Sequence, residues 1–462
     1  MTLHRVLDTI WPLLQEPRVK AALGKGALMI SVRDASRRLL IVVALAICND
    51  VRAECESIPG ESVETLESQL AQTERQLEQT PESERHKSEY RALQERALRQ
   101  LEALQCKAES QAPAETVKRG FNVATAFASV PILFITDRKQ VDSPADSFFG
   151  GDRKVNGVTY GRAIVRMPAE NYTPGKPLPP GITVDTEKNS KQGITVRRPT
   201  ELGETDFQAS LSEFRKALQP GDKLRVLLFI HGYNVTYADS MKAAARLTWG
   251  LRPLTVAPIA VSWPSQGMTL RYWQDEQTVE PSIERLRPIL GGIFANPNVD
   301  EVILVAHSMG TRIATRVLSQ LELQKASLPK LTRVAFAAAD LHDAEIQELW
   351  GRIGSLPASG WNFYTSRNDF ALRASQIVHA RPPVGDSRQR VFTLPPAETI
   401  DASTVAPALK GYGHSYVIDN PLLQLDLRRW ILEGAPAKNR GLQPGQRPPA
   451  VFWVIPELAF EK

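Results

Sequence analysis

The 462-residue sequence lacks the patterns by which most nucleotides, dinucleotides and metal ions are held. It has no G-x-x-x-x-G-K-[S/T] loop for nucleotide phosphates and no G-x-G-x-x-G turn for a dinucleotide. Its three cysteines and seven histidines show no spacing that is typical of a metal site. We therefore expect a protein that uses no cofactor and no metal.

A strong excess of one charge is also missing once the first residues are set aside. The chain has 56 Lys and Arg against 51 Asp and Glu, a net charge of +5. Residues 1–53 hold eight of the basic and four of the acidic residues, which leaves 48 against 47. Nucleic-acid-binding domains usually carry a clear basic excess, so we predict no nucleic-acid partner.

The apolar run Leu39–Ile47 is too short to cross a membrane, because it has nine residues where about 20 are needed. Three arginines precede it, and Val51 and Ala53 supply small residues after it, which is typical of a secretory signal. We predict export to the periplasm with cleavage near Ala53. Translation from Met29 instead of Met1 would place this signal at the N-terminus. The alternative is a short buried or interfacial helix in a cytoplasmic protein.

Two cysteines, Cys55 and Cys106, flank a stretch whose leucines have helical spacing. Thr80–Ser83 interrupts this stretch midway, with Pro81 at the expected start of the second helix. An antiparallel hairpin over residues 54–110 would bring the two cysteines together. A disulfide there would require an oxidising compartment and would stabilise the hairpin by about 4 kcal/mol. The alternative is two unpaired thiols.

The leucine stripe of this hairpin needs a surface to cover it, because two helices alone bury little core. The main domain, a second copy of the chain or another protein would each supply one. We expect coiled-coil-like packing, with self-association or partner binding as its function.

Ala306–Gly310 reads Ala-His-Ser-Met-Gly and follows the apolar run Val302–Val305. A helical pattern, Thr311–Leu321, comes directly after it. A serine on a sharp turn between a buried strand and a helix is the nucleophile elbow of α/β-hydrolases, usually G-x-S-x-G. Ala306 replaces the first glycine and is small enough to keep the packing. Ser308 is therefore the predicted nucleophile.

A nucleophilic serine needs a histidine base, which in this fold follows it in the chain. Of the histidines beyond Ser308, His414 lies in a glycine-flanked loop before the helical pattern Leu422–Leu432. His342 comes too early, and His379 lies on a predicted helix. We choose His414; the alternative is a loop histidine that caps a nearby helix.

An acid must orient that histidine. Asp369 follows the second predicted strand after the nucleophile, the usual position of the acid, whereas Asp340 follows the first. We prefer Asp369 and keep Asp340 as the alternative. Both residues precede helical patterns, so either also suits a helix N-cap.

The oxyanion hole requires backbone N–H groups from an earlier loop and from the residue after the nucleophile. The apolar run Arg225–Ile230 leads into His231–Asn234, the His-Gly turn that lipases and esterases use. We expect Gly232 to permit the conformation that directs the Tyr233 N–H at the substrate, with Met309 as the second donor. His231 and His307 are expected to hold these turns by hydrogen bonds.

The chain resembles the bacterial α/β-hydrolase family DUF900 of the esterase/lipase superfamily over residues 128 to 434. The resemblance is carried by Val130–Arg138, Thr159–Ala163, Phe229–Thr236, Ser262–Gly267, Ala306–Gly310, Tyr364–Leu372 and Gly413–Tyr416. It implies an α/β-hydrolase fold and hydrolase activity without a particular substrate, and it gives Ser308, Asp369 and His414 the triad roles. Asp275 matches a further recurrent acid of the family, at the site mouth or in a structural salt bridge. One departure is alanine at 339, where the family more often has proline.

Together these features predict an α/β-hydrolase fold, with a mostly parallel central sheet flanked by helices and an N-terminal antiparallel helical hairpin. The expected parts are an extension and signal peptide over 1–53, the hairpin over 54–110, the hydrolase domain over 128–434, and a flexible linker and tail over 435–462. Extra strands are expected between 137 and 200, beside the start of the main sheet.

The predicted function is a serine hydrolase that cleaves a carboxylic ester or similar acyl bond in a small substrate. Two alternatives stay open. One is a catalytically idle hydrolase fold that acts as an interaction module through its hairpin; the other is an acyltransferase with the same triad.

Overall fold

The computed structural model describes residues 62–111, 125–141, 148–169, 178–187, 193–266, 272–356, 358–406, 414–445 and 451–456. The predicted signal peptide, its cleavage near Ala53 and Cys55 lie outside the described residues, as does the side chain of Cys106. The predicted disulfide therefore lies outside them too.

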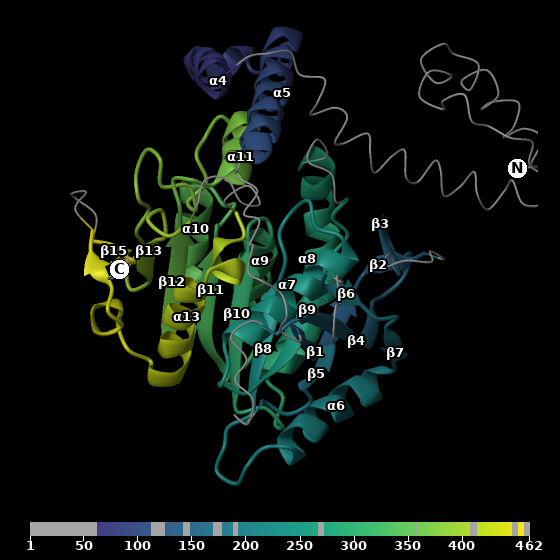
Figure 1. The fold of residues 1–462 in the computed structure, drawn as a ribbon. Helices are drawn as coiled ribbons and strands as arrows, with labels where there is room; N and C mark the ends of the chain where they lie inside the picture. The colour runs from purple at the N-terminus through teal and green to yellow at the C-terminus, as the bar shows by residue number, and fades with distance from the viewer. Residues whose placement is uncertain are drawn as a thin grey trace, which may run out of the picture. The chain divides into compact units, whose positions relative to one another are not determined.

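The centre of the fold is a 13-stranded sheet (Figure 1). Eleven of its strands follow the order β14-β15-β13-β12-β11-β10-β8-β9-β1-β4-β6, and the other two, β5 and β7, pair with β1 and β4. Neighbouring strands are parallel from β1 through to β13 and β15. The parallel strands are β1 (Thr125–Thr136), β8 (Arg225–Ile230), β9 (Val256–Ser262), β10 (Glu301–His307), β11 (Leu331–Ala337), β12 (Gly360–Thr365), β13 (Glu398–Asp401) and β15 (Trp453–Val454). Strands covered on both faces read as continuous apolar runs, as β8, β9 and β10 do.

Antiparallel strands extend the sheet beyond β1, as the sequence predicts. β4 (Thr159–Pro168) pairs with β1 over ten residues, from Phe127 opposite Pro168 to Thr136 opposite Thr159. The short strands β5 (Thr183–Glu187), β6 (Thr195–Val196) and β7 (Thr200–Leu202) complete this side. β2 (Arg138–Gln140) and β3 (Phe149–Arg153) form a separate ribbon.

Helices cover both faces of the sheet, so side chains along each strand alternate between two cores. On β8, Leu227 and Phe229 join one core, and Val226, Leu228 and Ile230 join the other. The first core lies against α7 (Tyr237–Gly250), α12 (Tyr416–Asp419) and α13 (Pro421–Glu433). The second lies against α6 (Glu204–Lys216), α8 (Tyr272–Phe294), α9 (Gly310–Leu323) and α10 (Asp343–Ile353). The predicted α/β-hydrolase architecture is confirmed.

The N-terminal hairpin consists of α4 (Val63–Gln79) and α5 (Ser88–Gln111). Leu66, Leu70, Leu77 and Leu101 are buried in its seam, and Thr73 Oγ1 donates to Gln100 Oε1 at 2.8 Å. The prediction that Pro81 starts the second helix is wrong. Pro81 instead caps the short 3₁₀ helix η1 (Glu82–Glu84), and α5 begins only at Ser88.

The hairpin packs on α11 (Phe370–His379), which supplies Ala374 and Ile377 to the same apolar cluster. Arg373 of α11 forms a two-pronged ion pair with Glu74, with N–O distances of 2.7 and 2.8 Å. Gln94 Nε2 donates to the carbonyl oxygens of Ile377 at 3.1 Å and Val378 at 2.7 Å, near the end of α11. The main domain therefore covers part of the leucine stripe.

We expect Gln94→Ala to lower the free energy of unfolding by about 1–3 kcal/mol, because it leaves buried carbonyl groups without a donor. Gln72→Ala is the matched control, since Gln72 is exposed on α4, and its effect should stay within about 0.5 kcal/mol. Urea unfolding of both variants measures the difference. Equal effects would mean that Gln94 does not help to hold the hairpin on α11.

Residues 435–445 belong to the fold, so the predicted linker over 435–462 does not begin where expected. Ala437 is buried in the core beside α13. Arg440 forms ion pairs with Asp426 and Glu398 at 2.7 and 2.8 Å, and its side chain is fully buried. The sequence shows no periodicity here because ion pairs from distant residues hold this segment. β14 (Gln443–Pro444) then pairs with β15 of the tail.

None of the described helices is both long and apolar enough to cross a bilayer.

Candidate active site

Ser308 lies on a sharp turn between the end of β10 and the start of α9. Its φ is +52°, a left-handed conformation that costs a non-glycine residue about 1–3 kcal/mol. Its backbone N–H donates to Ala337 O at 2.9 Å, and its carbonyl accepts from Thr311 N and Asp340 N. These bonds over-determine the strained turn and are the physical basis of the predicted elbow.

Small residues allow strand and helix to pass closely at this elbow. A Cβ on Gly310 would lie 2.4 Å from His231 O and 2.7 Å from Ile230 O. Ala306, at the position of the missing first glycine, is completely buried. Alanine therefore fits here, whereas Gly310 has to be glycine.

Asp369 and His414 are brought together from different parts of the chain. Asp369 follows β12 and caps α11, where its carboxylate accepts from Leu372 N at 3.1 Å. His414 Nδ1 lies 2.8 Å from both carboxylate oxygens of Asp369. Burial raises the pKa of the Asp369 carboxyl, and the adjacent His414 opposes that rise.

The other side of His414 faces the residue before the predicted nucleophile. The His307 Nε2–H donates to His414 O at 3.0 Å, and the two ring centroids are 4.5 Å apart. His414 Nε2 is buried and has no hydrogen-bond partner within the described residues. The structure thus joins Asp369 to His414 and places His414 against His307, without a hydrogen bond from Ser308 to the imidazole.

The predicted oxyanion turn lies directly against Ser308. A Cβ on Gly232 would lie 2.4 Å from Ser308 Cβ and 3.0 Å from its Oγ. Gly232 is therefore required by close approach, and the residue with a positive φ in this turn is Asn234, at +56°. Tyr233 and Met309, the predicted donors, are both buried.

His231 fixes the conformation of this turn by hydrogen bonds and ring stacking. Its Nδ1–H donates to Gly232 O at 2.7 Å, and its carbonyl accepts from Trp263 Nε1 at 2.7 Å. The His231 and Trp263 rings are stacked with their centroids 5.2 Å apart. Burial lowers the pKa of His231 well below its usual value, and the nearby Arg138 adds to this, so the imidazole stays neutral.

Sequence reasoning assigned no role to Arg138, which organises the layer behind the turn. Its guanidinium is completely buried and donates to Ser262 Oγ, Ser265 O and Val235 O at 3.0, 2.8 and 2.6 Å. Burial lowers its pKa to about 10, so it is still charged at neutral pH. The available signal was its place at the end of Val130–Arg138, one of the stretches that carry the family resemblance.

Asp275 is a buried acceptor rather than a surface ion pair. It accepts from Ser265 Oγ at 2.5 Å, from Gln266 N at 2.7 Å and from Asn234 N at 3.0 Å. These bonds tie the predicted oxyanion turn to the loop after β9. Burial raises the pKa of Asp275, and the three hydrogen bonds partly offset this.

Asp340, the alternative acid, belongs to a different cluster. It accepts from Ser375 Oγ at 2.5 Å and from Tyr272 Oη at 2.6 Å, and Arg312 Nη2 lies 3.4 Å from its Oδ1. Burial alone would raise its pKa, but Arg312 and these hydroxyl groups outweigh burial and lower it. His379 adjoins the same cluster, through Tyr272.

His307 provides a pH test of this packing. Burial, with a smaller contribution from His414, lowers its pKa to about 3 from 6.5. Between these values the unfolded chain binds the proton and the folded chain does not, so the free energy of unfolding falls as the pH decreases from 6.5. One such proton contributes about 1.4 kcal/mol per pH unit. We expect His307→Gln to weaken the dependence of the free energy of unfolding on pH, measured by chemical denaturation at several pH values below 6.5.

The matched control is His86→Gln, since His86 is exposed on the hairpin. The burial of His307 would be contradicted if His86→Gln and His307→Gln changed this pH dependence equally.

We expect Gly232→Ala to impair both folding and catalysis, because its Cβ would displace Ser308. The expected losses are about 1–3 kcal/mol in the free energy of unfolding and at least about 100-fold in kcat. Gly292→Ala on α8 is the control, because its Cβ meets no atom within 4 Å and it should cost nothing. Full hydrolytic activity in Gly232→Ala would mean that this turn does not border the reacting groups.

The family described as "Alpha/beta hydrolase of unknown function (DUF900)" matches residues 206–389. Over this stretch the chain is similar to that α/β-hydrolase family. This region includes Ser308 and Asp369, and His414 lies beyond its matched end. The family description names no function, so the substrate does not follow from it.

The solved structures to which the chain is similar include the following three. A lipase-esterase related protein from Clostridium acetobutylicum is 12% identical over 45% of this chain and 93% of its own, with a TM-score of 0.26. A thermostable esterase from Pseudomonas putida is 10% identical over 81% of this chain and 96% of its own, with a TM-score of 0.27. The RedJ thioesterase of Streptomyces coelicolor is 14% identical over 44% of this chain and 93% of its own, with a TM-score of 0.23. At these values nothing about mechanism follows, and no curated protein matches the chain.

Proposed function

We propose that this DUF900 hydrolase cleaves a small carboxylic ester or thioester through Ser308, His414 and Asp369. The observation that carries the proposal is the Asp369–His414 contact at 2.8 Å, packed through His307 against the strained serine elbow. A buried carboxylate on Nδ1 fixes the tautomer that leaves Nε2 free to accept a proton. The buried Nε2 without a protein partner agrees with that role.

In the proposed reaction, His414 Nε2 accepts the Ser308 proton as Oγ attacks the acyl carbon. The Tyr233 and Met309 N–H groups stabilise the oxyanion, and the resulting imidazolium protonates the departing alcohol or thiol. Water then releases the acid from the acyl-enzyme by the reverse proton transfers. The contact from Oγ to Nε2 is expected to form when substrate binds, as is common for such bonds.

The test is hydrolysis of matched p-nitrophenyl esters, thioesters and anilides of increasing acyl length by the purified protein. We expect turnover of the esters and thioesters, with burst kinetics from acyl-enzyme formation. Added alcohol as a second acceptor separates hydrolysis from acyl transfer. If no substrate of the panel turns over, the fold serves as an interaction module and the proposal fails.

We also propose that the protein acts in the periplasm, which is supported by the signal-like segment around Leu39–Ile47. The expected result is a mature N-terminus at Glu54 in protein recovered from periplasmic extract. Intact chain retained in the cytoplasm would contradict export.

A further inference from the structure

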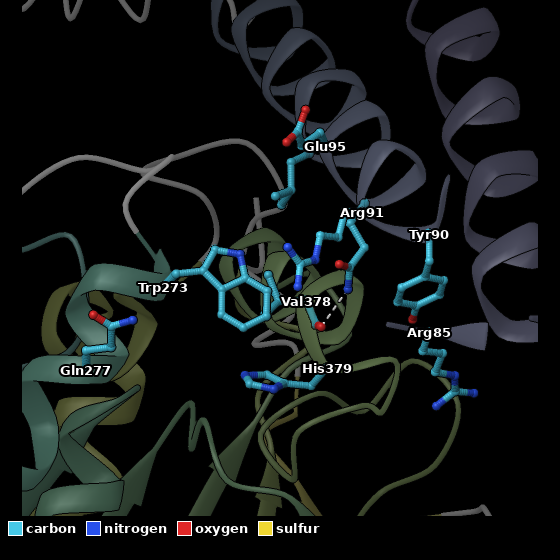
Figure 2. Close-up of a pocket in the computed structure, with 10 residues that line it drawn as sticks. Arg85, Tyr90, Arg91, Glu95, Trp273, Gln277, Val378 and His379 are labelled. Carbon is cyan, nitrogen blue, oxygen red and sulfur yellow. Dashed lines mark hydrogen bonds between the residues drawn. The ribbon is translucent and has the colours of Figure 1, made fainter. Parts of the chain in front are cut away.

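A cavity of about 640 Å³ lies between the hairpin and the hydrolase domain (Figure 2). It is bordered by α5, by the first turns of α8 and by the end of α11. Neither Ser308, Asp369 nor His414 lines it. Its volume is within the range of about 300–1,000 Å³ that is typical of small-molecule sites.

One part of the cavity wall is apolar. Trp273 is 48% exposed, and Figure 2 shows its indole ring beside Val378. Leu98 of α5 adds to the same lining. A large aromatic ring left open to a cavity offers a flat surface for an aliphatic or aromatic group.

Another part of the wall is cationic. Arg85 and Arg91 line the cavity, and within the described part of the chain neither forms an ion pair with a carboxylate. Figure 2 shows the Arg91 side chain reaching from α5 towards Trp273. The acidic side chain in the lining, Glu95, lies 3.7 Å from Arg99, which balances its charge.

A third observation is a buried hydroxyl without a partner. Tyr90 is only 5% exposed, and its Oη forms no hydrogen bond within the described residues. Figure 2 places this hydroxyl beside Arg85. Burial raises the pKa of Tyr90, although Arg85 opposes the rise, so the phenol remains a proton donor at neutral pH. A buried donor of this kind requires an acceptor.

We infer that this cavity binds an amphipathic organic anion, with its apolar body on Trp273 and its carboxylate or sulfonate between Arg91, Arg85 and the Tyr90 hydroxyl. Guanidinium groups bind such head groups through charge-assisted hydrogen bonds. This second site does not depend on the activity proposed for Ser308. It lies at one end of α11, and Asp369 lies at the other.

The test compares two fluorescent probes on the full chain. Anilinonaphthalene sulfonate carries an aromatic body and an anionic group, whereas N-phenylnaphthylamine has nearly the same body without charge. We expect the double variant Arg85→Gln/Arg91→Gln to weaken sulfonate binding about tenfold and to change binding of the neutral probe less than about twofold. Trp273→Ala should weaken both probes, and decanoate should displace the sulfonate.

Arg96→Gln is the matched control, because Arg96 is exposed on α5 and does not line the cavity. It should leave both affinities unchanged. Equal effects of the arginine variants on both probes, or no competition by decanoate, would overturn the anion site. Because Ser308→Ala should bind the sulfonate normally, the outcome is separate from that of the hydrolase proposal.

Discussion

Replacing Ser308 with alanine is expected to lower kcat for ester hydrolysis by about 10⁶-fold. The hydroxyl would be the attacking group, and Met309, the other residue of the turn between β10 and α9, has no hydroxyl. Alanine fits the same space, and Ser308 is already 99% buried, so the fold should be kept. Steady-state hydrolysis of p-nitrophenyl butyrate, with circular dichroism on the same samples, measures both effects.

Ser319→Ala controls for loss of a buried serine on α9, the helix that follows Ser308. Ser319 is buried on α9, and its hydroxyl meets Arg352 only at 3.4 Å. We expect its activity to stay within about twofold of wild type, because this long hydrogen bond lies away from the proposed triad. Substantial ester hydrolysis by pure Ser308→Ala would place the nucleophile elsewhere.

Asp369→Asn is expected to lower kcat by about 10⁴-fold with little change in stability. Asparagine also caps helices well, so α11 should still begin at this position. The asparagine amide, however, has one oxygen in place of the two that contact His414 Nδ1. Its NH2 group can donate to Nδ1, which favours the tautomer in which Nε2 carries the proton. The same ester assay, together with thermal unfolding, checks the separation of the two effects.

The comparison with Asp340→Asn decides between the two acids that the sequence offers. Asp340 is paired with Arg312 and bonded to Tyr272 and Ser375, so its loss should destabilise the fold by about 3–5 kcal/mol. The folded fraction should keep its kcat within about tenfold, because this cluster does not contact His414. A larger loss of kcat in Asp340→Asn than in Asp369→Asn would reverse the assignment.

The parts of the site that lie at strand ends could be predicted from the sequence. Ser308, Asp369 and the His231–Asn234 turn each follow an apolar strand, and parallel strands bring their carboxyl ends to the same edge of the sheet. Chain order and strand position therefore favour Asp369 over Asp340. The Asp369–His414 distance of 2.8 Å agrees with that choice.

The supporting layer could not be predicted, because its contacts join residues that are far apart in the chain. Arg138 reaches Val235 and Ser262, and Asp275 reaches Asn234, with no periodic pattern to mark either. The docking of the hairpin on α11 could not be predicted for the same reason. Gln94 meets α11 across more than 280 residues, and a leucine stripe alone does not specify which surface covers it.

Covalent labelling with a fluorophosphonate, followed by peptide mass mapping, is the most direct measurement of the proposed chemistry. A serine activated by His414 should form one stable adduct, on the peptide that contains Ser308, and prior incubation with an ester substrate should slow it. The folded Ser308→Ala variant should remain unlabelled. No adduct on folded wild-type protein, or an adduct on another serine with Ser308 unmodified, would contradict the assignment of Ser308 as the nucleophile.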